Sequence, residues 1–152
     1  MRLSLQLLAE RLSQRGNPAF AVNSEGWSCE RMRLLPPDGE PLIEGTLYAC
    51  NRLPEGPSAR GDVSYASCAF ALTGSQQLGR LEPCLLVENA SDAGDLLNLI
   101  ADVHDELAGA VARARELIWE DNGITSIVEI LSDLIGNPVY IVDSSLDRKS
   151  VV

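Results

Sequence analysis

The chain has 152 residues, 45% of them apolar, and a formal net charge of −10 at pH 7. This length suits one domain, or one small domain with appendages. No apolar run reaches the roughly 20 residues of a membrane-spanning helix. Residues 1–60 hold seven Arg and seven Asp or Glu, whereas residues 61–152 hold five Lys or Arg and fifteen Asp or Glu. Because nucleic-acid surfaces need clustered cations, we expect this chain to make no direct nucleic-acid contact. The lack of a long apolar run leads us to expect no membrane contact either.

The N-terminus and the cysteines indicate a cytoplasmic protein. The first ten residues are not a secretory signal, since Gln6 and Glu10 interrupt the apolar run. The four cysteines form no C-x-x-C pair and His104 is the only histidine, so we predict no metal site. We expect buried, reduced thiols that behave as small apolar side chains. The cysteines are Cys29, Cys50, Cys68 and Cys84.

In chain order, a helix is predicted first, over Ser4–Gln14, with three leucines on one face and a Gly-Asn-Pro stop after it. Strand-like segments follow, separated by turn and loop sequences, of which Leu53–Gly61 and Thr73–Gly79 are the longest. Because strands alternate with helices, we predict an α/β or α+β class. The predicted strands are Ala19–Val22, an irregular Trp27–Leu35, Gly45–Cys50, Val63–Leu72 and Pro83–Val87.

A long helix is predicted over Asp92–Glu120, capped by Ser91. Its apolar residues recur at intervals of three and four, which is the spacing of a coiled-coil seam. We hypothesise that the first half packs on the preceding domain and that the second half projects as the seam of a homodimer. The alternative is a helix that lies along its own domain. The predicted dimer seam is Ile100, Val103, Leu107, Val111, Ala114 and Ile118.

The last thirty residues predict a second sheet domain. Apolar residues from Gly123 onward form a helical stripe, which Gly136-Asn137-Pro138 ends, and Val139–Val142 is typical of a strand with a turn after it at Asp143–Ser145. One strand cannot satisfy its own backbone, so we expect this domain to continue beyond residue 152. The predicted organisation is a small sheet domain at 1–90, a connecting helix at 91–120 and an incomplete second sheet domain at 121–152. Trp119 and Gly123 are hinge candidates.

No catalytic constellation and no cofactor motif are evident. His104 lacks a nucleophilic partner at a useful spacing, and the carboxylates near it are most simply a solvated helix face. Gly74 and Gly79 have the spacing of a phosphate loop but not its Lys-Ser/Thr, which indicates a turn. We predict no enzymatic activity. A weaker alternative is a small enzyme that uses Cys50 or Cys84 as its nucleophile.

Residues 131–143, LSDLIGNPVYIVD, form a helix, a Gly-Asn-Pro break and an apolar strand ending in Asp. This pattern resembles the opening of the GAF- or PAS-like sensor domain in purine-catabolism-regulator-like (PucR-like, sugar-diacid-regulator-like) bacterial transcription factors. The strands Gly45–Cys50 and Pro83–Val87, followed by the long helix, are similar to the segment that precedes that sensor.

The resemblance implies a multidomain regulator with a sensory N-terminal region, a central sensor and a C-terminal helix-turn-helix that binds DNA. Our leading hypothesis is therefore a non-enzymatic, dimerising signalling region of a cytosolic transcription regulator, which would respond to a small-molecule effector while the DNA-binding part lies outside this chain. The alternative is the regulatory input domain of a signalling enzyme, such as a kinase or a nucleotide cyclase.

Overall fold

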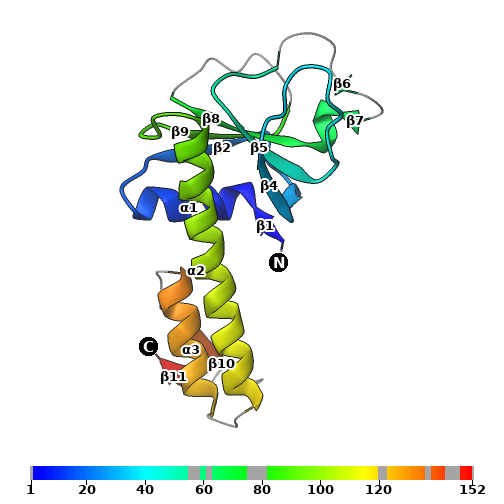
Figure 1. Ribbon diagram of the computed structural model, residues 1–152. Coiled ribbons are helices and arrows are strands. Elements are labelled where there is room, and N and C mark those ends of the chain that lie inside the picture. The colour runs from blue at the N-terminus through cyan, green and yellow to red at the C-terminus, as the bar shows by residue number, and fades with distance from the viewer. Residues whose placement is uncertain are drawn as a thin grey trace. The chain divides into compact units, whose positions relative to one another are not determined.

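The computed structural model describes residues 2–54, 59–60, 63–74, 82–119, 123–135, 138–142 and 148–151. It mixes helices with sheets, which confirms the predicted α/β class (Figure 1). The chain forms two compact units, Met1–His104 and Asp105–Val152, and the boundary between them falls inside the long helix.

The first helix, α1 (Leu5–Gln14), matches its prediction closely. The Ser4 hydroxyl accepts a hydrogen bond from the Leu7 backbone N–H at 3.2 Å and so caps the helix. Gly16, at φ +82°, takes the left-handed conformation that ends it. The predicted leucine face, Leu5, Leu8 and Leu12, is fully buried. Before α1, the short strand β1 (Leu3–Ser4) pairs with β3 (Ser28–Cys29).

Five strands form the central sheet of the first unit, in the order β2-β9-β8-β5-β4. The four strands from β4 to β9 run parallel, and β2 joins β9 in the antiparallel direction. The strands are β2 (Ala19–Val22), β4 (Arg31–Leu34), β5 (Thr46–Cys50), β8 (Ala69–Thr73) and β9 (Cys84–Val87).

Two sequence predictions around this sheet were wrong in detail. The predicted strand Val63–Leu72 is divided into β7 (Val63–Ser64), a 3₁₀ turn η1 (Tyr65–Ser67) and β8. The predicted loop Leu53–Gly61 contains β6 (Ala59–Arg60), which pairs with β7. Ser64 and Ser67 lie at this interruption, but two isolated serines in an otherwise apolar segment were not enough to predict it. The predicted loop Thr73–Gly79 lies outside the described residues beyond Gly74.

The two faces of the sheet carry side chains of different size. One face holds a core cluster built around Tyr48, Phe70 and Leu72, which connecting segments cover with residues such as Leu42 and Tyr65. The opposite face carries the small residues Ala49, Ala69 and Ala71 beside Leu47, Leu85 and Val87. Figure 1 shows α1 and the start of α2 on one side of the sheet and the β6–β7 segment on the other. Small side chains on the helical side allow close helix–sheet packing.

The long helix, α2 (Ala93–Trp119), confirms the predicted Asp92–Glu120 span. Its capping residue is Asp92 and not Ser91, because the Asp92 Oδ1 accepts the Asp95 N–H at 2.8 Å. Ser91 instead donates from its backbone N–H and its hydroxyl to the Asp95 carboxylate, at 2.9 Å each. These bonds lower the pKa of Asp95. Among the described residues, no helix is long and apolar enough to cross a bilayer.

The second unit contains the end of α2, the helix α3 (Gly123–Ile135) and an antiparallel hairpin. The predicted strand near Val139 is β10 (Tyr140–Val142). It pairs with β11 (Arg148–Val151), which contacts α3 and was not predicted, so the single unpaired strand inferred from the sequence was wrong. The predicted break Gly136-Asn137 and the predicted turn Asp143–Ser145 lie outside the described residues.

Candidate functional site

The predicted dimer seam divides into a covered part and a partly open part. Ile100, Val103 and Leu107 are 0%, 1% and 2% exposed within the single chain. Their apolar surface is already removed from water, so a second copy would gain nothing by covering it. These three residues are therefore core residues and not seam residues, which corrects the predicted seam over its first half.

The second half of α2 keeps apolar surface in contact with solvent. Val111 and Ala114 are half-buried, and between them lie the exposed Ala112 and Arg113. Ile118 belongs to the helix, but its side chain lies outside the described residues. Val111 and Ala114 are thus the described seam residues whose apolar surface a partner could still cover.

Helix α3 lies beside the second half of α2 (Figure 1). Glu106, Ala110 and Arg113 of α2 and Ile130 and Asp133 of α3 line a shared cavity of about 140 Å³. Val128 of α3 is fully buried, whereas three further apolar residues of this helix are only half-buried. The pair of helices therefore buries one apolar layer and leaves a second one incompletely covered. The half-buried α3 residues are Ile127, Ile130 and Leu131.

The hinge candidates lie at the two ends of the α2–α3 connection. Trp119 is the last residue of α2, and Gly123 is the first residue of α3. Residues 120–122 and the Trp119 side chain lie outside the described part of the chain. The helices thus end and begin where the sequence placed the hinge, and hinge motion itself stays a prediction.

All four cysteines are free and buried, which confirms the sequence prediction. Burial raises the pKa of Cys29 to about 11 and the pKa values of Cys50 and Cys84 to about 12. Cys50 and Cys84 share one core cluster, but β8 lies between their strands, so two strand spacings of together about 9.6 Å separate them across the sheet, and the register adds an offset of two residues along it. A disulfide cannot bridge that separation. Their high pKa values also oppose a nucleophilic role.

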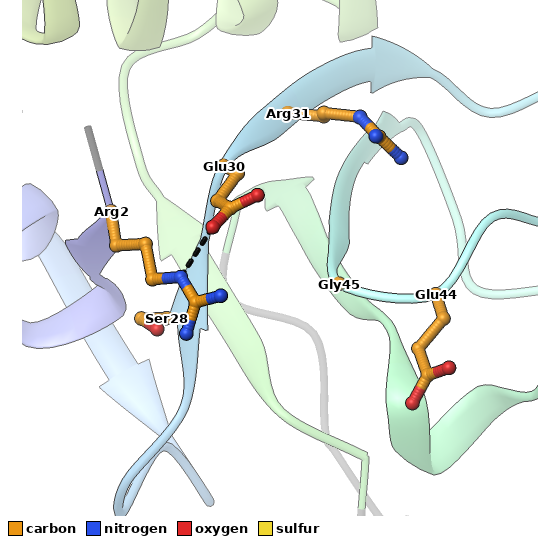
Figure 2. A pocket seen from close by; sticks show the side chains of 6 residues that line it. All are labelled: Arg2, Ser28, Glu30, Arg31, Glu44 and Gly45. Carbon is orange, nitrogen blue, oxygen red and sulfur yellow. Dashed lines mark hydrogen bonds and ion pairs between the residues drawn. The ribbon is translucent and has the colours of Figure 1, made fainter.

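A polar cavity of about 290 Å³ lies at the amino ends of β4 and β5 (Figure 2). Arg2 donates a hydrogen bond to the exposed Glu30, and this contact lowers the pKa of the Glu30 carboxyl. Figure 2 shows Arg31 and Glu44 directed away from the Arg2–Glu30 pair. The cavity carries two cations and two exposed carboxyl groups that do not converge on one point. This geometry provides neither a general acid nor a single-sign binding site.

The remaining titratable candidates do not form a site. His104 is half-buried on α2, and Asp102, Asp105 and Glu106 nearby are exposed, as expected for a solvated helix face. In the part of the chain that the structure describes, no group of three or more His, Cys, Asp or Glu residues could hold a metal ion.

Two polar residues with structural roles had no clear marker in the sequence. Asn51, directly after β5, accepts the Ala93 backbone N–H at 2.8 Å and so anchors the first turn of α2. Arg11 on α1 is 8% exposed, and its guanidinium donates to the Gln14 side chain at 2.9 Å. Asn is common in turns, so Asn51 before a loop does not stand out in the sequence. An Arg in a leucine-rich helix usually faces solvent. The contacts of both residues therefore become evident only in the folded chain.

No protein-family model matches this chain, and no significant match was found among curated proteins or solved structures. The resemblance to purine-catabolism-regulator-like transcription factors therefore depends on the quoted residues alone.

Proposed function

We propose that this chain is a non-enzymatic signalling and dimerisation region of a cytosolic bacterial transcription regulator, with the DNA-binding part outside these 152 residues. One observation carries the proposal. The 27-residue helix α2 begins in the unit Met1–His104 and ends in the unit Asp105–Val152. We infer that this helix is the element through which the first unit influences the second, because it is the described segment that belongs to both.

The second support comes from the α2–α3 helical pair. Val111 and Ala114 on α2, with Ile127, Ile130 and Leu131 on α3, are apolar yet only half-buried. Two copies of such a pair would form a four-helix arrangement that buries these positions. The predicted homodimer is thus retained, with the second half of α2 and α3 together as its interface.

The chemistry of the described residues supports a role without catalysis. The four thiols are buried with pKa values raised by burial, and the carboxylates of the polar cavity are exposed and paired or dispersed. The acidic charge of residues 61–152 would repel a duplex, so DNA reading belongs to another part of the regulator.

The amino-acid sequence of the full-length protein and its binding to DNA test this proposal. We expect a basic helix-turn-helix encoded downstream of Val152, and the purified full-length protein should shift a DNA fragment from its own promoter in a gel. A kinase or cyclase domain in that position would contradict the proposal and support the alternative of an input domain for a signalling enzyme.

A further inference from the structure

A second crevice, of about 360 Å³, lies at the carboxyl ends of the parallel strands β4 and β5. The crevice has the volume of a site for a small molecule. Its lining residues are Leu35, Pro36, Pro37, Asp38, Arg52, Leu53 and Pro54.

The inner part of this crevice is apolar and firmly attached to the sheet. Leu35 and Leu53 pack against the core cluster, and Pro54 is buried. The Leu35 backbone N–H donates to the Ala49 carbonyl at 3.0 Å, which extends the β4–β5 pairing into the crevice wall. Pro36 and Pro37 have fixed φ angles. The cavity is therefore largely preformed, which lowers the entropy cost of binding.

The two charged residues of the lining differ in whether they already interact with another group of the chain. Arg52 and Asp38 are both exposed and both line the crevice. Asp38 already interacts with another group of the chain. No salt bridge to Arg52 is found among the described residues. A guanidinium binds a carboxylate through two parallel hydrogen bonds, so Arg52 is suited to an organic carboxylate whose apolar body enters the Leu-Pro wall.

The crevice is built by the part of the sequence in which the charges balance. Its residues all belong to segment 1–60, whose seven Arg balance seven Asp and Glu, whereas the ten excess negative charges lie in residues 61–152. The segment that builds the crevice therefore adds no net negative charge of its own beside a bound carboxylate.

The crevice connects to α2 through one residue. Asn51 directly precedes Arg52, and its Oδ1 accepts the backbone N–H of Ala93, the first residue of α2, at 2.8 Å. A ligand held by Arg52 would restrain residues 51–54 and thereby the anchor of the helix. All of these residues lie within the single compact unit Met1–His104.

We propose that the crevice between the ends of β4 and β5 binds a small carboxylate with a short apolar body, and that Asn51 passes its binding to the first turn of α2. The binding step stands independently of the proposed function, whereas its use as a signal rests on that function.

Amide NMR shifts of the 152-residue chain test the binding, with 4-methylpentanoate and leucine as probes. The two probes share an isobutyl group and a carboxylate and differ in the amino group. At about 10 mM, tenfold above a 1 mM dissociation constant, at least one probe should shift the amides of Arg52, Leu53 and Ala93. Tighter binding of leucine would show that Asp38 contributes through the ligand's ammonium group.

Matched variants separate the site from general anion binding. Arg52→Gln should weaken binding at least tenfold, because it removes the carboxylate partner. Arg33→Gln, which removes an exposed Arg on β4 outside the crevice lining, should leave binding unchanged. Asn51→Ala should retain the shifts at Arg52 and lose the shift at Ala93.

Two results would overturn the proposal: no shift with either probe, or equal weakening by Arg52→Gln and Arg33→Gln. Retention of the Ala93 shift in Asn51→Ala would overturn the link to α2 but not the site. Failure to bind leaves the proposed dimer intact, since the mass of the chain without ligand is measured separately.

Discussion

At the scale of single residues, the cysteines bear on the alternative that this chain is an enzyme with a cysteine nucleophile. Cys50 and Cys84 lie in the core between large side chains, and burial raises the pKa of each to about 12. Since the thiolate is the nucleophilic form, such thiols are inert at neutral pH. Their burial serves packing, in keeping with the small volume and low polarity of cysteine.

We predict that iodoacetamide labels all four cysteines of the native chain more slowly than it labels glutathione at pH 7.5. In urea, where burial is lost, all four should react at the rate of a free thiol. Mass spectrometry of timed samples resolves the sites. A Cys50 or Cys84 that reacts faster than glutathione in the native chain would restore the alternative of a cysteine-dependent enzyme.

The raised pKa values also predict an alkaline loss of stability. Above the ordinary thiol pKa of 9.0, the unfolded chain releases protons that the folded chain retains up to about pH 12 for Cys50. The free energy of unfolding should therefore fall as pH rises through this range, by about 1.4 kcal/mol per pH unit for such a thiol. Urea titrations at about pH 7, 8, 9 and 10.5 measure this slope.

The matched variant for that slope is Cys50→Ala, which removes one thiol and keeps every other titrating group. We expect it to show a shallower decline between pH 9 and 10.5 than the native chain and a parallel dependence below pH 8. Identical slopes above pH 9 would show that Cys50 titrates normally and is not shielded by the core.

At the scale of elements, the start of α2 depends on a short side-chain network. Asp92 caps the helix through the Asp95 N–H, and the Asp95 carboxylate accepts two hydrogen bonds from Ser91. We predict that Asp92→Ala lowers the free energy of unfolding by about 1 kcal/mol, as loss of an N-cap typically does.

Asp102→Ala is the control for the cap, because it removes the same charge from an exposed position inside the same helix. It should be neutral or slightly stabilising, since Ala is the better helix former. Chemical denaturation followed by circular dichroism compares the two variants. Equal losses would mean that overall charge, and not the cap, sets the effect.

The face of the sheet that the helices cover should tolerate a larger side chain less well than an exposed position of α2 does. Ala71 on β8 is fully buried on that face, where the side chains are small. We predict that Ala71→Leu destabilises the chain by about 1–3 kcal/mol through overpacking. Ala112→Leu, which adds the same atoms at an exposed position of α2, should change stability by less than about 0.5 kcal/mol. A thermal melt in which both variants match the native chain would contradict close helix–sheet packing.

Local patterns predicted the helices well, because their information lies in a single segment. The leucines of α1 and the seam spacing of α2 gave both spans within a residue or two. The periodicity of apolar residues does not show whether they pack against their own chain or against a second copy. For this reason Ile100, Val103 and Leu107 were predicted in the dimer seam, although the chain itself buries them.

Features that depend on distant segments were not predicted. The pairing of β10 with β11 escaped detection because Arg148–Val151 begins with two charged residues and has no alternating pattern. The Arg52 crevice arises only because β4 and β5 are parallel neighbours, so that their carboxyl ends meet. Neither strand alone encodes which strand becomes its neighbour in the sheet.

At the scale of the whole molecule, the proposal requires a second copy of the chain. Apolar residues on the second half of α2 and on α3 are half-buried, and a homodimer through these helices would cover them. Val111 is the described seam residue at which a charge should act most strongly, because a buried, unpaired carboxylate is costly in an interface and tolerable in a free helix.

Sedimentation equilibrium of the 152-residue chain tests this claim most directly. We predict a species of twice the 16.4 kDa chain mass, which Val111→Glu shifts toward monomer by at least tenfold in dissociation constant while the helical circular dichroism is retained. Glu116→Ala, at an exposed position of the same helix, should leave the dimer unchanged. A single species of 16.4 kDa at the highest soluble concentration would contradict the proposed dimer and with it the transmission of a signal through paired helices.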